Sequence, residues 1–299
     1  MPTLLDLTRQ GDVATISDAS QLSKVKLLSP QQLYELWERQ PWSAHAIDFS
    51  RDREGWLSVP DADRDDMIWS LSSFFVGEER VTTQFSGLVM AYEDQAEEAF
   101  LTTQQVDEAR HVQHFNRFYE EVLGYDGSID DRLARVRRDL NDSFVELFDR
   151  RLVAAGERLI ADPTDLEAKI DFVVTYHMVI EGTLALTGQN FITLTFEERA
   201  ILPGFLEGFR KISQDEHRHV AYGTWFLQQK AKDPAHARQI EARLLELLPI
   251  AQGVLVPAGR DPAGDWTLLG RSSAEVNEFA FTALTRRLKV IGVGLGVAA

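Results

Sequence analysis

The sequence predicts an all-α protein built around a four-helix bundle with additional helices. Apolar residues recur at helical spacing through most of the chain, and no segment alternates convincingly as a strand. A glutamate followed one helix later by Glu-x-x-His also occurs twice. Residues three apart share a helix face, so each motif directs a carboxylate and an imidazole toward one point. The two sets are Glu78 with Glu108 and His111, and Glu181 with Glu216 and His219.

The overall composition excludes several classes of protein. A formal charge of −16 and a pI near 4.9 oppose electrostatic binding to nucleic acid or to an anionic membrane. The absence of cysteine excludes disulfides and thiolate sites. The chain start lacks a secretory pattern, and the apolar end, 289 to 299, is too short for a membrane span. We therefore expect a cytoplasmic protein with no integral membrane segment.

The N-terminal part is predicted to be mostly irregular. Residues 1 to 30 show no sustained period and read as an arm. Ser29 and Pro30 predict the start of a short helix, as N-cap and first residue, that ends before Pro41. The stretch from 41 to 60 is interpreted as a packed loop. The acid-rich segment from 61 to 66 then resembles a helix N-terminus.

The first bundle pair is predicted as helices over about 61 to 92 and 95 to 123. Positions three, four and seven away from Glu78 are mainly apolar, whereas those around Glu79 are mainly Ser and Thr. Glu78 is therefore predicted to face the core and Glu79 to face outward. Gly124 closes the second helix.

The connection to the second pair is long. It holds an additional helix, predicted over about 128 to 161, which suits the crossover of a ferritin-like bundle. The next helix covers about 165 to 194 and carries Glu181. Gly182 and Gly188 weaken it locally, so we expect a bulge or an unwound turn there.

The helix with the second motif is predicted to open at Glu197-Glu198 and to run to about Lys232, with a kink or restart at Pro203-Gly204. Two further helices, about 234 to 250 and 273 to 289, complete the chain. We expect one helical domain over 1 to 299, with the bundle core at about 65 to 230 and C-terminal helices over 234 to 299.

Four carboxylates that converge in a core would each cost several kcal/mol if they stayed unpaired. Two divalent cations would neutralise them, and ligands rich in oxygen with one imidazole per metal suit iron or manganese. The predicted ligands are Glu78, Glu108, His111, Glu181, Glu216 and His219. Such a pair with open positions can bind and reduce dioxygen, which indicates a di-metal oxidase or oxygenase.

With these residues in place, the chain resembles the ribonucleotide-reductase small-subunit superfamily and, within it, the ribonucleotide-reductase-like ligand-binding oxidases. The resemblance covers about 65 to 230. It rests on Gly77-Glu78-Glu79-Arg80-Val81-Thr82, Asp107-Glu108-Ala109-Arg110-His111, Tyr176-His177-Met178-Val179-Ile180-Glu181-Gly182 and Asp215-Glu216-His217-Arg218-His219. It implies a manganese and iron pair, alternatively two irons. Glu78 and His111 would serve manganese; Glu181, Glu216 and His219 would serve iron; Glu108 would bridge.

The resemblance also implies chemistry at two residues that bind no metal. In those oxidases a valine and a tyrosine at the offsets of Val81 and Tyr176 are joined by an ether bond, formed when the metals meet dioxygen. It further implies a long-chain fatty acid or similar ligand in an apolar channel. The candidate lining residues are Phe74, Phe75, Phe85 and Val89, and the alternative for each of them is ordinary core packing. A homodimer is expected.

Three other polar residues lie near the predicted ligands. Asp215 matches a position that in the superfamily hydrogen-bonds a ligand histidine, here His111, and its alternative is an exposed acid. His114 and His177 are interpreted as outer hydrogen-bonding or core histidines, because the set of six ligands is already complete.

Other functions stay open. The chain has Phe115 where many reductase subunits place a radical tyrosine, so one alternative is a ribonucleotide reductase small subunit that lacks this tyrosine. Another is a di-iron oxygenase of a small molecule. The alternative outside enzymes is ferritin-like iron storage, which a large hollow oligomer would favour over a dimer.

Overall fold

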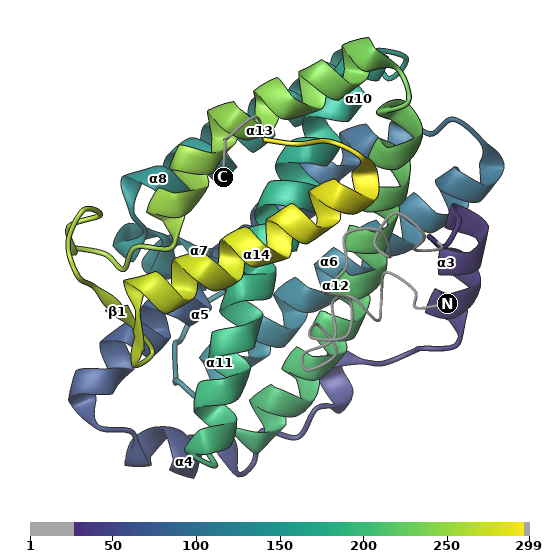
Figure 1. Ribbon diagram of the computed structural model, residues 1–299. Helices are drawn as coiled ribbons and strands as arrows, with labels where there is room; N and C mark the ends of the chain where they lie inside the picture. Colours follow the sequence, from purple (N-terminus) through teal and green to yellow (C-terminus); the bar gives the residue numbers. More distant parts are fainter. Residues whose placement is uncertain (1–26, 296–299) are drawn as a thin grey trace.

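The computed structural model describes residues 27–295, and within this range the chain is predominantly helical (Figure 1). Most of the predicted arm, 1 to 26, lies outside the described residues. The strands in the described part form one short antiparallel pair, β1 (Thr267–Leu268) and β2 (Arg271–Ser272). The all-α prediction is confirmed, and its four-helix core carries the two motifs.

The bundle consists of two helix pairs. α5 (Asp61–Met90) and α6 (Gln95–Glu121) pack together, joined by a short turn that Asp94 caps. The second pair is α12 (Pro203–Lys230) and a continuous helical run made of α10 (Leu166–Val173), η5 (Val174–Ala185) and α11 (Leu186–Glu198). Each of the four helices carries one of the predicted glutamates, and α6 and α12 also carry the two histidines. All six side chains are buried in the bundle.

The predicted distortion near Glu181 is confirmed. η5 is a π-helix, in which the wider turn displaces side chains from α-helical register. Its freed carbonyl groups find side-chain donors: Thr183 Oγ1 donates to Met178 O at 2.8 Å, and buried Arg287 donates to Gly182 O. The distortion thus lies where the sequence places Gly182, beside the glutamate that enters the site.

Three short helical elements precede the first pair in the chain. α3 (Pro30–Glu38) begins at Ser29 with the predicted N-cap, and Gln32 completes a capping box. The stretch from 41 to 60 is not a loop throughout, because it contains η2 (Ala44–Ala46) and α4 (Asp52–Ser58). α4 is only two turns long and carries Gly55, so its helical pattern is too short to recognise.

The crossover is broken rather than one helix, so the prediction for 128 to 161 is wrong. It consists of α7 (Ile129–Val136), η3 (Arg137–Asp139), α8 (Asp142–Phe144), the π-helix η4 (Val145–Arg151) and α9 (Leu152–Ala161). Asn141 stabilises the break: its Oδ1 accepts from Phe144 N, and its Nδ2 donates to Gly253 O and Val256 O. The two carbonyl partners lie more than 100 residues away, so local sequence does not reveal them.

The prediction that Glu197-Glu198 opens the second motif helix is also wrong. These residues end α11, and α12 starts at Pro203 after Leu202 in the left-handed region, with φ 53°. The cap comes from Asp52, whose carboxylate accepts from Gly204 N at 2.9 Å and Phe205 N at 2.6 Å. A buried acid from α4 thus caps the helix, in place of the start that was predicted at Glu197-Glu198.

The C-terminal helices agree with prediction. α13 (Pro234–Val254) and α14 (Ser273–Ile291) both pack on η5, and α14 also crosses α12 (Figure 1). Among described residues one helical run, Leu166–Glu198, is long and apolar enough for a membrane span, but 83% of the relevant window is buried in the protein. Its central position in the bundle accounts for its apolar character.

Candidate metal centre

The six predicted ligands meet in the middle of the bundle. Within the described residues they form two groups of four buried side chains, and in each group one potential ligand atom per residue lies within 4.8 Å of the others. Glu108 and Glu216 belong to both groups. The first group adds Glu78 and His111, and the second adds Glu181 and His219. Sharing of Glu108 was expected from the resemblance, whereas sharing of Glu216 was not.

Both imidazoles turn the same nitrogen toward the carboxylates. His111 Nδ1 lies 3.3 Å from Glu78, 3.4 Å from Glu108 and 3.5 Å from Glu216. His219 Nδ1 lies 3.0 Å from Glu108 and 3.1 Å from Glu181. A cation between each Nδ1 and its carboxylates would therefore meet one nitrogen and several oxygens.

The donor set fits divalent cations. Glu181 Oε2 and Glu216 Oε2 are buried and have no hydrogen-bond partner among the described residues, which is costly unless a cation binds them. Without a cation, burial raises the pKa of Glu78 to about 8, and burial and the charge of Glu216 raise the pKa of Glu181 well above its usual range. The acidic oxygens and two imidazoles match iron or manganese better than a structural zinc.

Each histidine is held from behind by the aspartate of the other motif. His111 Nε2 lies 3.2 Å from Asp215 Oδ2, and His219 Nε2 lies 3.2 Å from Asp107 Oδ2. A carboxylate without a proton only accepts, so Nε2 carries the hydrogen and Nδ1 is free to bind a cation. The predicted contact between Asp215 and His111 is confirmed, and Asp215 is buried rather than an exposed acid.

Asp107 is a residue that the sequence reasoning missed. The sequence does indicate this residue, because the repeat is longer than Glu-x-x-His. Both motifs read Asp-Glu-x-Arg-His, from Asp107 to His111 and from Asp215 to His219. Arg218, which is fully buried, joins the two aspartates by donating to Asp107 Oδ2 at 2.9 Å and to Asp215 Oδ1. Arg110 also bonds both, at 3.2 Å to Asp215 Oδ2. Two carboxylates and two guanidinium groups thus form a neutral layer behind the histidines.

The N-terminal segment closes this layer. Trp37 Nε1 donates to Asp107 Oδ1 at 2.8 Å, and Trp42 Nε1 donates to Asp215 Oδ2 at 2.7 Å. Trp42 also stacks on His111, with ring centroids 6.3 Å apart. The two tryptophans therefore bond the aspartates from the N-terminal segment, outside the four-helix core.

Tyr176 lies directly at the carboxylates. Its hydroxyl is 2.5 Å from Glu108 Oε1 and also bonds Glu181, and Gln104 Nε2 donates to it at 3.1 Å. Burial and the charge of Glu108 raise the pKa of Tyr176 well above its usual range. His177 contacts Gln104, which in turn bonds Tyr176, and it contacts none of the predicted metal ligands. This agrees with its interpretation as an outer hydrogen-bonding histidine.

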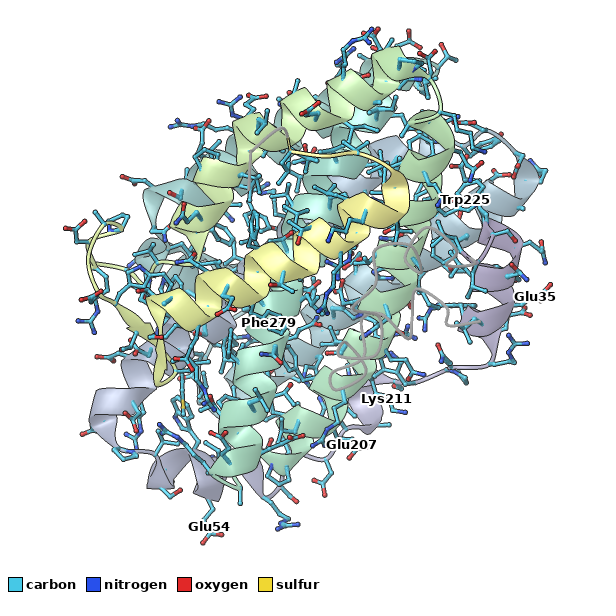
Figure 2. All side chains as sticks on the ribbon, viewed as in Figure 1. Glu35, Glu54, Glu207, Lys211, Trp225 and Phe279 are labelled. Carbon is cyan, nitrogen blue, oxygen red and sulfur yellow. The ribbon has the colours of Figure 1, made fainter. Side chains whose placement is uncertain are left out.

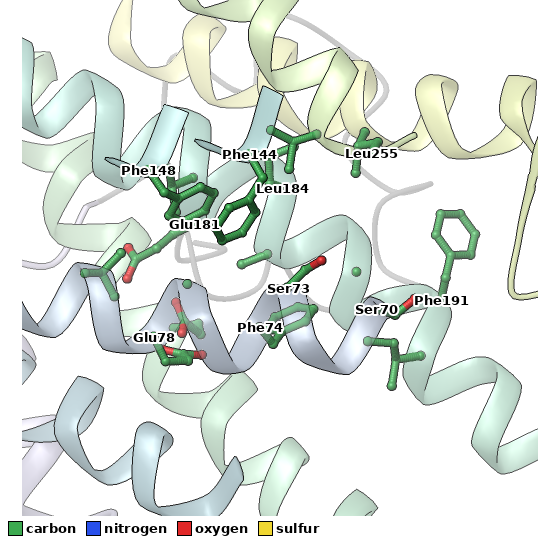
Figure 3. Close-up of a pocket in the computed structure, with 18 of the residues that line it drawn as sticks. Ser70, Ser73, Phe74, Glu78, Phe144, Phe148, Glu181, Leu184, Phe191 and Leu255 are labelled. Carbon is green, nitrogen blue, oxygen red and sulfur yellow. The ribbon is translucent and has the colours of Figure 1, made fainter. Parts of the chain in front are cut away.

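An apolar cavity opens from the centre along α5. Counted together with the solvent at its open mouth, its space is about 750 Å³, and Glu78 and Glu181 lie at one end while Ser70 and Phe191 lie at the other (Figure 3). Val81 and Tyr176 line the same cavity as the four glutamates. Apart from these residues, the lining comes mainly from apolar side chains of α5, the broken crossover, η5, α11 and the loop around the β hairpin.

The predicted channel lining is largely wrong. Phe74 lines the cavity, but Phe75, Phe85 and Val89 do not. Phe75 and Phe85 are fully buried in the core. The cavity instead runs toward Phe144 and Phe148, which the break and π-helix of the crossover turn inward. A helical wheel of α5 alone cannot distinguish the face toward the cavity from the face toward α6.

His114 is a core histidine without a hydrogen-bond partner among the described residues. It packs between Phe49, Phe115 and Phe205, with ring centroids 5.3 to 5.7 Å away. Burial lowers the pKa of His114 to about 3. The ring is therefore neutral in the folded protein at neutral pH.

His114 is expected to make the protein sensitive to acid. Its folded pKa is depressed, so its contribution to stability is present above the unfolded pKa of about 6.5 and is lost as the pH falls toward 3. Between pH 7 and 5 this should remove about 2 kcal/mol from the free energy of unfolding. In urea titrations, His114→Leu should reduce the difference between the two pH values by that amount. An equal difference in both proteins would contradict this role.

Comparisons with known proteins agree with the geometry. A family model described as ribonucleotide reductase, small chain, matches residues 20–279. Among solved structures, point mutants of an R2-like ligand-binding oxidase with anaerobically reconstituted Mn/Fe cofactor share 26% and 25% identity, with TM-scores of 0.75 and 0.74. Each match covers 90% of this chain and 94% of the other. A further mutant of that oxidase, with aerobically reconstituted Mn/Fe cofactor, has 26% identity and a TM-score of 0.74. This match covers 92% of this chain and 98% of the other.

Proposed function

Because the chain belongs to the ribonucleotide reductase small-chain family, whose members are di-metal oxidoreductases, we propose that it is a manganese and iron oxidase. In this proposal it activates dioxygen and binds a long-chain, fatty-acid-like ligand. The observation that carries it is one continuous site: two groups of buried glutamate and histidine ligands open onto an apolar cavity. The Mn/Fe cofactor of the similar solved structures supports the choice of metals.

The proposed ligand assignment agrees with the two groups except at Glu216, which belongs to both and is assigned to iron alone. Glu78 and His111 would hold manganese, Glu181, Glu216 and His219 would hold iron, and Glu108 would bridge. The bound pair would supply electrons for the reduction of dioxygen. The protein itself orients both imidazoles through Asp107 and Asp215, and the surrounding apolar core limits access of water.

Oxygen uptake tests this function directly. Metal-free protein loaded anaerobically with Mn(II) and Fe(II) should consume dioxygen when exposed to it, in proportion to the metal bound. Protein loaded with Zn(II), which has no redox chemistry, is the matched control. Equal uptake by the two preparations would contradict an oxidase.

We also propose that Val81 and Tyr176 form an ether cross-link. The bond would join Tyr176 Oη to Val81 Cβ; the phenol hydrogen and the Cβ hydrogen leave as two protons and two electrons, and dioxygen takes the electrons. Both side chains line the cavity beside the carboxylates, and Glu108 and Glu181 lie within hydrogen-bond distance of the phenol to accept its proton.

The proposed ligand follows from the shape and polarity of the cavity. Its far part is apolar and suits an alkyl chain, whereas its inner end carries the metal-binding carboxylates. A ligand carboxylate at that end could occupy an open metal position, because hard cations favour oxygen ligands. An apolar carboxylate therefore matches both ends of the cavity.

Filling the cavity is expected to remove this ligand. Ala185 is half-buried and lines the cavity, so Ala185→Trp should occupy space needed by the alkyl chain. Fatty acid extracted from purified protein and quantified by mass spectrometry should fall about tenfold, equivalent to about 1.4 kcal/mol of binding. Ala161→Trp, at an exposed position on α9, is the control. Equal fatty acid in both variants would contradict a ligand in this cavity.

The family match also favours a second candidate, a ribonucleotide reductase small subunit without the radical tyrosine. Phe115 packs among Phe74, Phe75 and Phe209, so the position holds no phenol. Reductase activity restored by adding the chain to a catalytic large subunit would select this function over the oxidase.

The quaternary structure and the cellular location belong to the proposal as well. We expect a homodimer in the cytoplasm. Light scattering during size-exclusion chromatography separates a dimer from a monomer or a hollow storage oligomer. A hollow oligomer would instead favour iron storage.

A further inference from the structure

A second buried polar cluster lies outside the metal centre, on the opposite side of Tyr176. Tyr222 donates its hydroxyl hydrogen to Glu97 Oε1 at 2.6 Å, and Lys169 Nζ bonds the same oxygen at 2.9 Å. Tyr222 is fully buried, and Glu97 and Lys169 are each 2% exposed. Glu93 and Lys230 connect this cluster to the surface. None of these five residues contributes to the proposed ligand set or to the cavity.

Aromatic rings connect the cluster to the centre on one side and to the surface on the other. Ring centroids are 4.5 Å apart between Tyr176 and His177, 5.2 Å between His177 and Tyr222, and 6.2 Å between Tyr222 and Trp225. Trp225 is partly exposed on the outer side of α12 (Figure 2). A line of closely packed rings therefore runs from the carboxylates to the protein surface.

We propose that Tyr222 is a redox relay that passes single electrons from a surface donor, through Trp225, to the metal centre. This inference rests on the proposed function, because the centre and dioxygen supply the oxidant. The donor is a one-electron reductant that reaches Trp225 from solution. The relay would return the centre to its reduced form after each oxidation.

The hydrogen bond to Glu97 gives Tyr222 the chemistry of a relay. Burial and the charge of Glu97 raise the pKa of Tyr222 well above its usual range, so the phenol keeps its hydrogen at rest. A phenol that loses an electron becomes a strong acid, and a carboxylate at 2.6 Å can take the proton in the same event. Lys169 balances the charge of Glu97 before this transfer, and Glu93 balances Lys169 after it.

The transfer balances in two steps. In the first, Tyr222 gives one electron to the oxidised centre, its O–H bond breaks, and the proton passes to Glu97. In the second, Trp225 gives one electron to the tyrosyl radical, and Glu97 returns the proton. The surface reductant then restores Trp225. The net result is one electron moved inward, with no net movement of protons in the cluster.

Tyr119 provides a matched comparison. It is also fully buried, but its hydroxyl bonds the neutral hydroxyl of Ser72 at 2.8 Å instead of a carboxylate. It therefore has no base to take its proton, and we expect it to take no part in the relay. Tyr119→Phe and Tyr222→Phe remove the same atom from comparable surroundings.

The first test uses metal-free protein, so it does not depend on the metal centre. The chain has no cysteine, and Gln229 lies one helical turn beyond Trp225 on α12, so Gln229→Cys can carry a ruthenium photosensitiser beside the tryptophan. Flash oxidation should produce a tryptophan radical whose absorption gives way to that of a tyrosyl radical. Tyr222→Phe should abolish this conversion, and Tyr119→Phe should preserve it. Conversion that is unchanged in Tyr222→Phe overturns the relay.

The second test uses protein loaded with manganese and iron and oxidised by dioxygen. Ascorbate should then reduce the centre, and the optical spectrum of the centre gives the rate. Reduction should be at least about tenfold slower in Tyr222→Phe and Trp225→Phe than in the wild type or Tyr119→Phe. Equal rates in all four proteins overturn the relay. Failure of every protein to bind metal or react with dioxygen would refute the proposed function instead, and the flash experiment would still decide the redox properties of Tyr222.

Discussion

Replacement of Glu108 by alanine is expected to lower the metal content from about two ions per chain to one or fewer. Glu108 belongs to both ligand groups, and its oxygens lie near both histidines, so its loss weakens both proposed sites. Removal of groups that merely orient a ligand costs about 10 to 100-fold in affinity, and removal of a shared ligand should cost at least that much. Elemental analysis after loading and desalting measures the effect.

Glu79→Ala is the matched control. Glu79 is the neighbour of a proposed ligand on the same helix, but it is only partly buried and bonds Thr83. It should therefore keep the metal content of the wild type. Full metal content in Glu108→Ala would refute the bridging role, and loss of metal in Glu79→Ala would show that the measurement reports a general loss of structure.

Tyr176→Phe should prevent the cross-link and remove its stabilisation. Aerobically loaded wild-type protein should have an intact mass lower by two hydrogen atoms than the same protein kept metal-free, whereas the variant should show no change. The bond would join residues 95 positions apart, from 81 to 176. By the chain-entropy model for cross-links, closure of a loop near 100 residues contributes about 4 to 5 kcal/mol to the free energy of unfolding.

The stabilisation by the cross-link can be separated from the effect of removing the Tyr176 hydroxyl itself. Each protein is unfolded in urea before aerobic loading, and again after loading and removal of the metal. The free energy of unfolding should rise for the wild type and stay unchanged for Tyr176→Phe. Tyr119→Phe also lacks a buried phenol but retains both Val81 and Tyr176, so it should gain as the wild type does. A lower mass in Tyr176→Phe, or no loss of mass in the wild type, would contradict the proposed bond.

Features with a local sequence pattern could be predicted. The apolar neighbours of Glu78 placed it in the core, and it is 6% exposed, whereas Glu79 is partly exposed. Gly182 beside Glu181 indicated a distorted helix, and η5 is a π-helix there. The repeated motif also brought all six predicted ligands into two overlapping groups. The first two features are determined by residues within one or two turns, whereas the convergence of the ligands follows from the repeat of the motif on paired helices.

Features that depend on distant contacts could not be predicted. Asp52 fixes the start of α12 from about 150 residues away, and Asn141 bonds the end of α13 to break the crossover. The cavity is a consequence of that break, because Phe144 and Phe148 enter it from the crossover. Asp107 differs, since the repeat Asp-Glu-x-Arg-His was visible in the sequence, and only its crossed pairing with His219 needed the structure.

The six side chains are proposed to hold two different metal ions at the inner end of the cavity. Anomalous diffraction tests this proposal most directly, with crystals of protein loaded anaerobically with Mn(II) and Fe(II) and data collected at both metal edges. We expect manganese beside Glu78 and His111, iron beside Glu181, Glu216 and His219, and Glu108 between them. Absence of anomalous density at these residues, or a single ion bound elsewhere, would contradict the proposed centre.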